Sequence, residues 1–250
     1  MKQRNFYWLS MLALLVWLGV WHSAPSAQTQ TKPRETASPL PDFDLRNQSI
    51  NRAEPAPDAP KLWGLQRPLS PTSTAAPNVI ARRFAQSYAT PLRLTAADVN
   101  ALTVAREYRT DHNGLTHVTL QQAHRGIPVF EGEFTAHIAR NGEVMAASST
   151  LTNRLAETVN ATEPTLTAPQ ALRIAGDYAQ ANQYTRDVTP ELVYFPLTDD
   201  HTRLAWQMTL WLRDAPDVYL IVVDAERGSL LYRRNLTSYE RANYEQAQSG

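Results

Sequence analysis

The side chains that could do chemistry in this chain are histidines and carboxylates, because the sequence contains no cysteine. His117 and His124 lie seven positions apart in a run that alternates apolar and polar residues. Successive side chains of a strand point to opposite faces, so this odd spacing separates the two rings unless a bulge intervenes. They are therefore poor joint metal ligands, and we expect both to be hydrogen-bonded residues of strands and turns.

Two pairs of carboxylates contain the residue types that general acid–base catalysis uses. Glu131 and Glu133 fall on one side of an expected strand, and Asp199 and Asp200 are adjacent in an expected loop. We interpret both pairs as solvated faces and turn formers. The chain also lacks a His-Glu-x-x-His motif, a Gly-x-Ser-x-Gly elbow and a glycine-rich phosphate loop. The sequence thus predicts no catalytic residue, no cofactor-binding residue and no metal ligand.

Composition narrows the class of protein further. The 250 residues include 24 basic and 24 acidic side chains, so no charge imbalance favours nucleic acid or an anionic membrane surface as a partner. The apolar content is ample for a core of one or two domains. The absence of cysteine excludes disulfides and thiolate metal sites.

The first 27 residues have the organisation of an export signal. A positively charged start precedes an apolar run from Phe6 to Trp21, which is shorter than the roughly 20 residues of a spanning helix. Small residues between Ser23 and Ala27 supply a cleavage site. An uncleaved membrane anchor is the alternative. Both interpretations predict a secreted or extracytoplasmic protein.

Residues 28–77 form a segment rich in proline, serine and threonine, which cannot repay its ordering entropy by burial. We expect a surface linker. Two short apolar stretches within it, Pro41–Leu45 and Leu62–Leu65, could dock on the folded part as latches.

The remainder predicts the same arrangement twice. Asn78 can cap a helix with the apolar stripe Ile80, Phe84 and Tyr88, and a second helix opens at Thr167 with proline and glutamine in its first turn. Four strand-like runs follow each helix: 101–109, 115–124, 133–139 and 143–150 after the first, and 192–197, 203–213, 218–224 and 229–233 after the second. The predicted fold class is α+β, with two helix-on-antiparallel-sheet subdomains at 78–155 and 160–234 and a polar tail at 235–250.

Two stretches resemble known families. Residues 113–142, NGLTHVTLQQAHRGIPVFEGEFTAHIARNG, resemble the fungalysin/thermolysin propeptide (FTP) domain, which folds and restrains the peptidase that follows it. The segments ALRIAGDYA (171–179) and VVDAERGSLLY (222–232) resemble a PepSY-type domain, associated with peptidase inhibition. These resemblances imply cystatin-like and PepSY-like subdomains. For Asp224 and Gly228, a direct inhibitory role and a plain hairpin turn both stay open.

The resemblances imply a non-catalytic prodomain, an intramolecular chaperone and inhibitor of a secreted fungalysin-type (M36) zinc metallopeptidase. The chain itself would not be an enzyme, zinc would belong to the partner alone, and the catalytic domain would be bound in cis or in trans. No nucleic acid, and no membrane beyond an N-terminal anchor, is expected as a partner. Two alternatives are an N-terminal fragment of the zymogen, whose catalytic domain is missing from this chain, and a stand-alone extracytoplasmic protein that binds a peptide or ligand.

Overall fold

A computed structural model describes residues 39–48, 61–63, 67–90 and 94–237. The expected export signal and most of the polar tail lie outside the described residues. The elements are β1 (Phe43–Asp44), η1 (Leu45–Gln48), β2 (Lys61–Trp63), α1 (Pro77–Ser87), α2 (Ala96–Asn100), β3 (Thr103–Arg109), β4 (Thr116–His124), β5 (Ile127–Ile138), β6 (Val144–Ser149), α3 (Leu155–Thr158), α4 (Ala168–Ala179), β7 (Glu191–Thr198), β8 (His201–Trp211), β9 (Val218–Asp224) and β10 (Leu230–Asn235).

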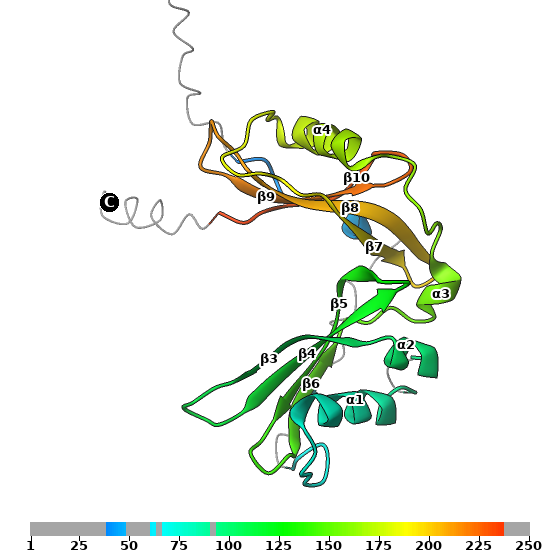
Figure 1. Cartoon of the computed structure of the whole chain (residues 1–250), viewed down its shortest axis with the longest axis vertical. Coiled ribbons are helices and arrows are strands. Elements are labelled where there is room, and N and C mark those ends of the chain that lie inside the picture. Colours follow the sequence, from blue (N-terminus) through cyan, green and yellow to red (C-terminus); the bar gives the residue numbers. More distant parts are fainter. Residues whose placement is uncertain (1–38, 49–60, 64–66, 91–93, 238–250) are drawn as a thin grey trace, which may run out of the picture. The chain divides into compact units, whose positions relative to one another are not determined.

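The predicted mixture of helix and antiparallel strand is confirmed. Within the described part of the chain the strands form one sheet of ten, in the order β1-β10-β9-β8-β7-β5-β4-β3, with β6 beside β5 and β2 beside β6. Figure 1 shows α1 against β4–β6 and α4 against β8 and β9. Each helix therefore covers its own group of antiparallel strands.

Helix α1 seals the first group of strands. Ile80 and Phe84 are buried against a cluster that includes Val118, Leu120 and Phe134 of β4 and β5. The predicted cap at Asn78 is wrong. Ala76 occupies the N-cap position without a side-chain hydrogen bond, because the proline at 77 already has the helical φ and starts the helix.

The β4–β5 hairpin turns at Arg125 and Gly126, whose φ values of 51° and 82° are those of a two-residue turn with both central residues left-handed. Strand β5 begins directly afterwards at Ile127, well before the 133 expected from the sequence. The ladder with β4 is irregular between Gln121 and Ala123, where extra β5 residues are accommodated. This irregularity sets which residues of the two strands face one another.

Helix α4 seals the second group. The predicted capping box is confirmed: the backbone N–H of Thr167 donates to Gln170 Oε1 at 2.8 Å. The predicted alternation in β8 is confirmed too, since Met208, Leu210 and Leu212 are buried against Ala171 and other small residues of α4. The apolar face of β8, which repeats every second residue, therefore packs against the apolar stripe of α4.

The two groups of strands are joined, which the sequence reading of two separate sheets did not include. Val129 of β5 pairs in parallel with Tyr194 of β7. The neighbouring Phe130 continues this contact, with its ring centroid 5.2 Å from that of Phe195. Because β5 begins at Ile127, it is long enough to pair with β7 at Val129 as well as with β4 and β6.

The segment expected as a linker docks at two places. Phe43 pairs with Arg233, and Asp44 with Tyr232, so β1 adds to β10. Lys61 pairs with Ser148, and β2 adds to β6. The latch at 41–45 and the described part of the latch at 62–65 therefore join the sheet as strands.

Two short helices were not expected from the sequence. Thr95 and Asp98 form a capping box that starts α2, and the carboxylate of Asp98 also accepts hydrogen bonds from the backbone N–H groups of Arg154 and Leu155. Asp98 is only 6% exposed. One buried carboxylate thus fixes the start of α2 and the start of α3 together.

Candidate functional site

His117 and His124, which the sequence spacing made poor joint metal ligands, have different neighbours in the structure. The His117 ring meets His137 edge-on, with centroids 4.7 Å apart, whereas the ring of His124 lies 5.8 Å from that of Tyr194. Among the residues that the structure describes, no group of three or more histidine, cysteine, aspartate and glutamate side chains could hold a metal. That the chain has no catalytic, cofactor-binding or metal residue stays a prediction.

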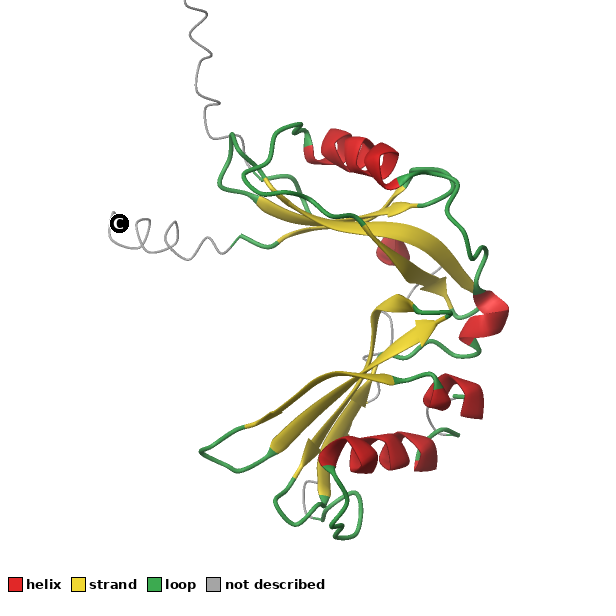
Figure 2. Ribbon diagram, in the orientation of Figure 1, coloured by secondary structure: helices red, strands yellow, loops and turns green. Residues whose placement is uncertain are grey.

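The face of β3–β5 opposite α1 gathers polar and aromatic side chains, and we call it the histidine face. It carries Arg106, Tyr108, His117, Thr119, Thr135 and His137, which pair in register across the three strands or alternate with the buried residues of β4 and β5. Figure 2 shows no helix of the described chain against this face. Strand β3, at its edge, is exposed along its whole length.

Two imidazoles contact each other at the centre of the histidine face. The Nδ1 atoms of His117 and His137 are 2.6 Å apart, and the Oγ1 of Thr110 is 2.8 Å from Nε2 of His117. Tyr108 stacks on His117, with centroids 4.7 Å apart and planes 10° from parallel. Burial, and then the nearby His117, lower the pKa of His137.

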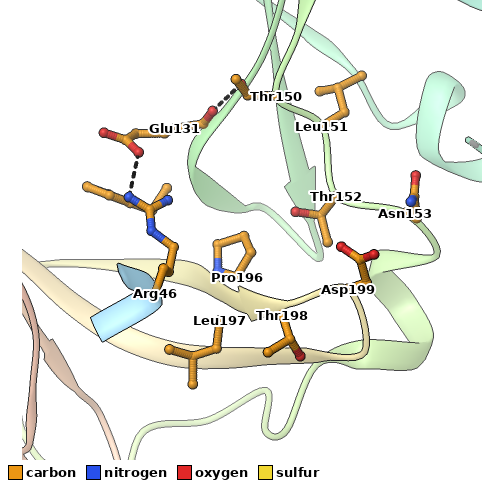
Figure 3. A pocket seen from close by; sticks show the side chains of 11 residues that line it. Arg46, Glu131, Thr150, Leu151, Thr152, Asn153, Pro196, Leu197, Thr198 and Asp199 are labelled. Atoms are coloured by element: carbon orange, nitrogen blue, oxygen red, sulfur yellow. Dashed lines mark hydrogen bonds and ion pairs between the residues drawn. The ribbon is translucent and has the colours of Figure 1, made fainter. Parts of the chain in front are cut away.

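A cavity of about 260 Å³ lies where β5 and β7 meet (Figure 3). Its lining includes Arg46 and Glu131, the loop residues Thr150–Asn153, and Pro196–Asp199 at the end of β7. Of the two carboxylate pairs, Glu131 and Asp199 line this cavity and Glu133 and Asp200 do not. Asp200 lies 3.9 Å from Arg154 instead, in an exposed ion pair. All four residues are exposed, in agreement with their interpretation as solvated side chains.

Arg46 of η1 is held tightly beside this cavity. Its guanidinium forms ion pairs with Asp44 at 2.7 Å and with Glu131 at 2.9 Å. It also lies over the rings of Phe130, Phe195 and Tyr232, at 5.7, 5.0 and 5.9 Å from their centroids. Burial lowers the pKa of Arg46, but the hydrogen bonds that its guanidinium donates to Asp44 and Glu131 outweigh this effect and the pKa is raised. The sequence marked this segment as a latch without showing that an arginine anchors it.

Asp224 has the geometry of a turn former. Its Oδ1 accepts hydrogen bonds from the backbone N–H groups of Glu226 and Arg227, and its Oδ2 accepts one from Nε of Arg203 at 2.7 Å. Burial raises the pKa of Asp224, but these donors reverse the effect and the pKa is lowered. Gly228 closes the same turn with φ 71°. These contacts support the hairpin interpretation of Asp224 and Gly228.

Comparison with known proteins places this geometry in a family context. Residues 100–151 match the family model described as Fungalysin/Thermolysin Propeptide Motif. Thermolysins of Alicyclobacillus acidocaldarius subsp. acidocaldarius and of Bacillus caldolyticus are each 33% identical to this chain over 135 residues, which are 51% of this chain and 24% of the relative. The thermostable neutral protease NprT of Geobacillus stearothermophilus is 31% identical over 140 residues, with the same shares.

The chain spans about a quarter of the length of the curated relatives that it matches. Among solved structures, the Bacillus megaterium YpeB C-terminal domain aligns with a TM-score of 0.36 and 14% identity, over 69% of this chain and 70% of that chain.

The predicted resemblance to the FTP domain is confirmed by the match of residues 100–151 to the propeptide model. These residues contain β3 to β6 and hence the histidine face. The matched model describes a propeptide and not a catalytic domain, in agreement with the expectation that this chain is not itself the peptidase. In the described part of the chain, no helix has the length and apolar character needed to cross a membrane.

Proposed function

We propose that this chain is the prodomain of a secreted zinc metallopeptidase of the thermolysin or fungalysin type, which it helps to fold and keeps inactive. The observation that carries the proposal is the match of residues 100–151 to the propeptide motif. The identity of 33% to thermolysins over 135 residues extends the support beyond that motif. The chain would act by binding, without chemistry of its own.

The motif corresponds to a surface that is formed before any partner arrives. Its strands are fixed from the other side by α1, whose Ile80 and Phe84 are buried in the shared core. A ligand that binds only the folded state of a second protein stabilises that state by mass action. A rigid sheet face can therefore favour the folded catalytic domain and occupy part of its surface at the same time.

Strand β3 and the histidine face are the parts of the motif that we assign to the catalytic domain. Val104 and Tyr108 of β3 are each 47% exposed, which places two large apolar side chains on one edge strand. Aromatic residues at the centre of a contact contribute strongly to binding energy. The second half, with its PepSY-like segments at 171–179 and 222–232, would add contacts and complete the inhibitor.

We place the protein outside the cytoplasm. The support is the signal-like N-terminal sequence, with its charged start and its apolar run from Phe6 to Trp21. An antibody to the chain should find it in the extracytoplasmic fraction of the source cells.

The decisive experiment is a titration of an active thermolysin-type peptidase from the same genome with the full chain, read by cleavage of a quenched peptide. We expect inhibition with an affinity of micromolar or better, and a higher refolding yield of the peptidase when the chain is present. The chain should first be shown to be folded by circular dichroism. If it then gave no inhibition at tens of micromolar, the proposed inhibitory function would be refuted.

A matched pair of variants tests whether the exposed edge strand β3 contacts the catalytic domain. Val104→Asp places a charge on exposed β3, and Val79→Asp places the same charge on exposed α1, where Val79 is 37% exposed. We expect the first variant to weaken inhibition at least tenfold, because a buried unpaired charge is costly in an interface, and the second to leave it unchanged. Equal inhibition by both variants would move the interface away from β3.

A further inference from the structure

The contact between His117 and His137 lies at the centre of the histidine face, and the proposed function makes no use of its protonation chemistry. His117 lies on β4 and His137 on β5, directly opposite each other in the register. Their Nδ1 atoms approach to 2.6 Å, which is hydrogen-bonding distance and excludes a water between them. Both side chains are half-buried, so the contact is partly shielded from solvent.

The chemistry of imidazole limits the protonation states that this contact accepts. One Nδ1 must carry the hydrogen and donate, and the other must accept. The pair can hold one additional proton, because an Nε2 atom outside the contact takes it. With two additional protons, both Nδ1 atoms carry hydrogens that face each other, and the bond between them is lost.

The hydroxyl of Thr110 is compatible with either direction of the hydrogen bond between His117 and His137. The hydroxyl Oγ1 lies 2.8 Å from Nε2 of His117, and a hydroxyl can accept from an Nε2–H or donate to a bare Nε2. Thr110 follows β3 directly, and its backbone N–H donates to Leu115, so it closes the β3–β4 connection. The histidine pair is thus linked to the end of the edge strand.

We propose that His117 and His137 are an acid-operated clasp, which holds β3 and β4 against β5 and opens when both imidazoles are protonated. The geometry of the contact carries the inference, and it does not depend on the proposed function. The clasp would confer on the propeptide motif a stability that falls in mildly acidic surroundings.

The charged groups around the pair are of both signs, so burial and the facing imidazole set the cost of the second proton. On β3, the guanidinium of Arg106 lies 5.2 Å from the centroid of Tyr108, which in turn covers His117. On β5, Glu133 is the carboxylate on the same face, two register positions beyond Thr135. Strand β6 contributes Ala146 and Ser148, and the register of β2 sets Lys61 next to Ser148. The adjoining turns carry Asp111, His112 and Arg140, the last with its side chain against Gly114.

The sign of the pH effect follows from this arrangement. An ordinary imidazole becomes protonated below about pH 6.5, so the unfolded chain takes up both protons there. The folded pair resists the second, in agreement with the lowered pKa of His137, whose causes are burial and then His117. The unfolded state then binds more protons, and stability is present above about pH 6.5 and lost as the pH falls below it.

Urea unfolding of the full chain between pH 8 and pH 5 tests the clasp. His137→Asn retains an amide that can donate to or accept from His117 but does not titrate, and His112→Asn removes an imidazole outside the pair. From pH 7 to pH 5 we expect the unfolding constant of the wild type and of His112→Asn to rise about tenfold more than that of His137→Asn, as loss of one proton difference requires. Parallel pH profiles for all three proteins would overturn the proposal.

Histidine ring ¹⁵N spectra of the wild type give a second measurement that needs no variant. We expect one Nδ1 of the pair to stay unprotonated at a pH below the ordinary imidazole value of about 6.5. Two pair rings that titrate independently near that value would refute the clasp, even if His137→Asn failed to fold.

Discussion

The Nη2 atom of Arg46 lies 2.9 Å from Oε2 of Glu131, although 85 positions separate the two residues in the sequence. Arg46 belongs to the proline-rich segment that precedes the first core helix, and Glu131 to the strand shared by both groups of antiparallel strands. A single guanidinium therefore ties the N-terminal segment to the place where those groups meet.

Replacement of Arg46 with alanine should lower the free energy of unfolding by about 2 kcal/mol, because the ion pairs to Asp44 and Glu131 and the contacts with three rings are lost together. Urea denaturation of the full chain measures the change. Arg83→Ala, which removes an exposed arginine of α1, is the control and should change stability little. An equal effect of the two substitutions would show that Arg46 does not anchor the segment.

Trp206→Ala should destabilise the second half. Its Nε1–H donates to the carbonyl of Leu166 at 2.8 Å, and its ring packs against the cluster under α4. We expect a loss of about 3 kcal/mol, at the lower end for such a truncation because the residue is only half-buried. Trp206→Phe keeps most of the packing and loses the hydrogen bond, so thermal melts should place it between the wild type and the alanine variant.

Gly142→Ala should loosen the contact between the β5–β6 turn and residue 73. Gly142 has φ 82°, and an added Cβ would lie 1.9 Å from the carbonyl oxygen of Ser73. We expect a loss of about 2 kcal/mol or more. Gly126→Ala is a matched control, since Gly126 has the same φ but nothing within 4 Å of an added Cβ. A smaller loss of unfolding free energy for Gly126→Ala would assign the difference to the contact with Ser73. Equal losses would show that this contact contributes nothing to stability.

Asp224→Asn should be costly at neutral pH and less so in acid. The amide keeps an acceptor for the turn but loses the ion pair with Arg203, which we expect to cost about 3 kcal/mol at pH 7. Because the pKa of Asp224 is lowered in the folded protein, its carboxylate contributes stability above the unfolded value of 3.8, and that stability is lost as the pH falls further.

Unfolding curves at pH 7 and at pH 3 should therefore show a smaller difference between wild type and Asp224→Asn at the lower pH. Asp187→Asn, at an exposed position, is the comparison and should show no such trend. A constant difference at both values would mean that Asp224 acts through shape alone.

Local patterns predicted the local structure well. Thr167, followed by proline and glutamine, gave the start of α4, and the alternation from Leu204 to Leu212 gave the buried face of β8. Both depend on neighbours within a few positions, where propensity and period decide the outcome. The cap at Asn78 failed because Pro77 itself begins the helix.

Pairings between distant segments could not be predicted in this way. Nothing near Phe43 specifies β10, and nothing near Val129 specifies Tyr194, because a pair of strands is chosen by the whole fold. The histidine contact was missed for a related reason. Counting back from the paired His124 and Ile127 without a shift would place His117 opposite Phe134, and the irregularity after Gln121 moves it to His137.

The docking of β1 on β10 and of β2 on β6 has a consequence for solubility. Each pairing occupies an outer row of backbone donors and acceptors that would otherwise be available to another molecule. Exposed sheet borders of this kind are templates for self-association, and natural proteins shield them. We therefore expect the segment that composition marks as a connector to limit aggregation, because a chain shortened to begin after it would leave the borders at β10 and β6 unpaired.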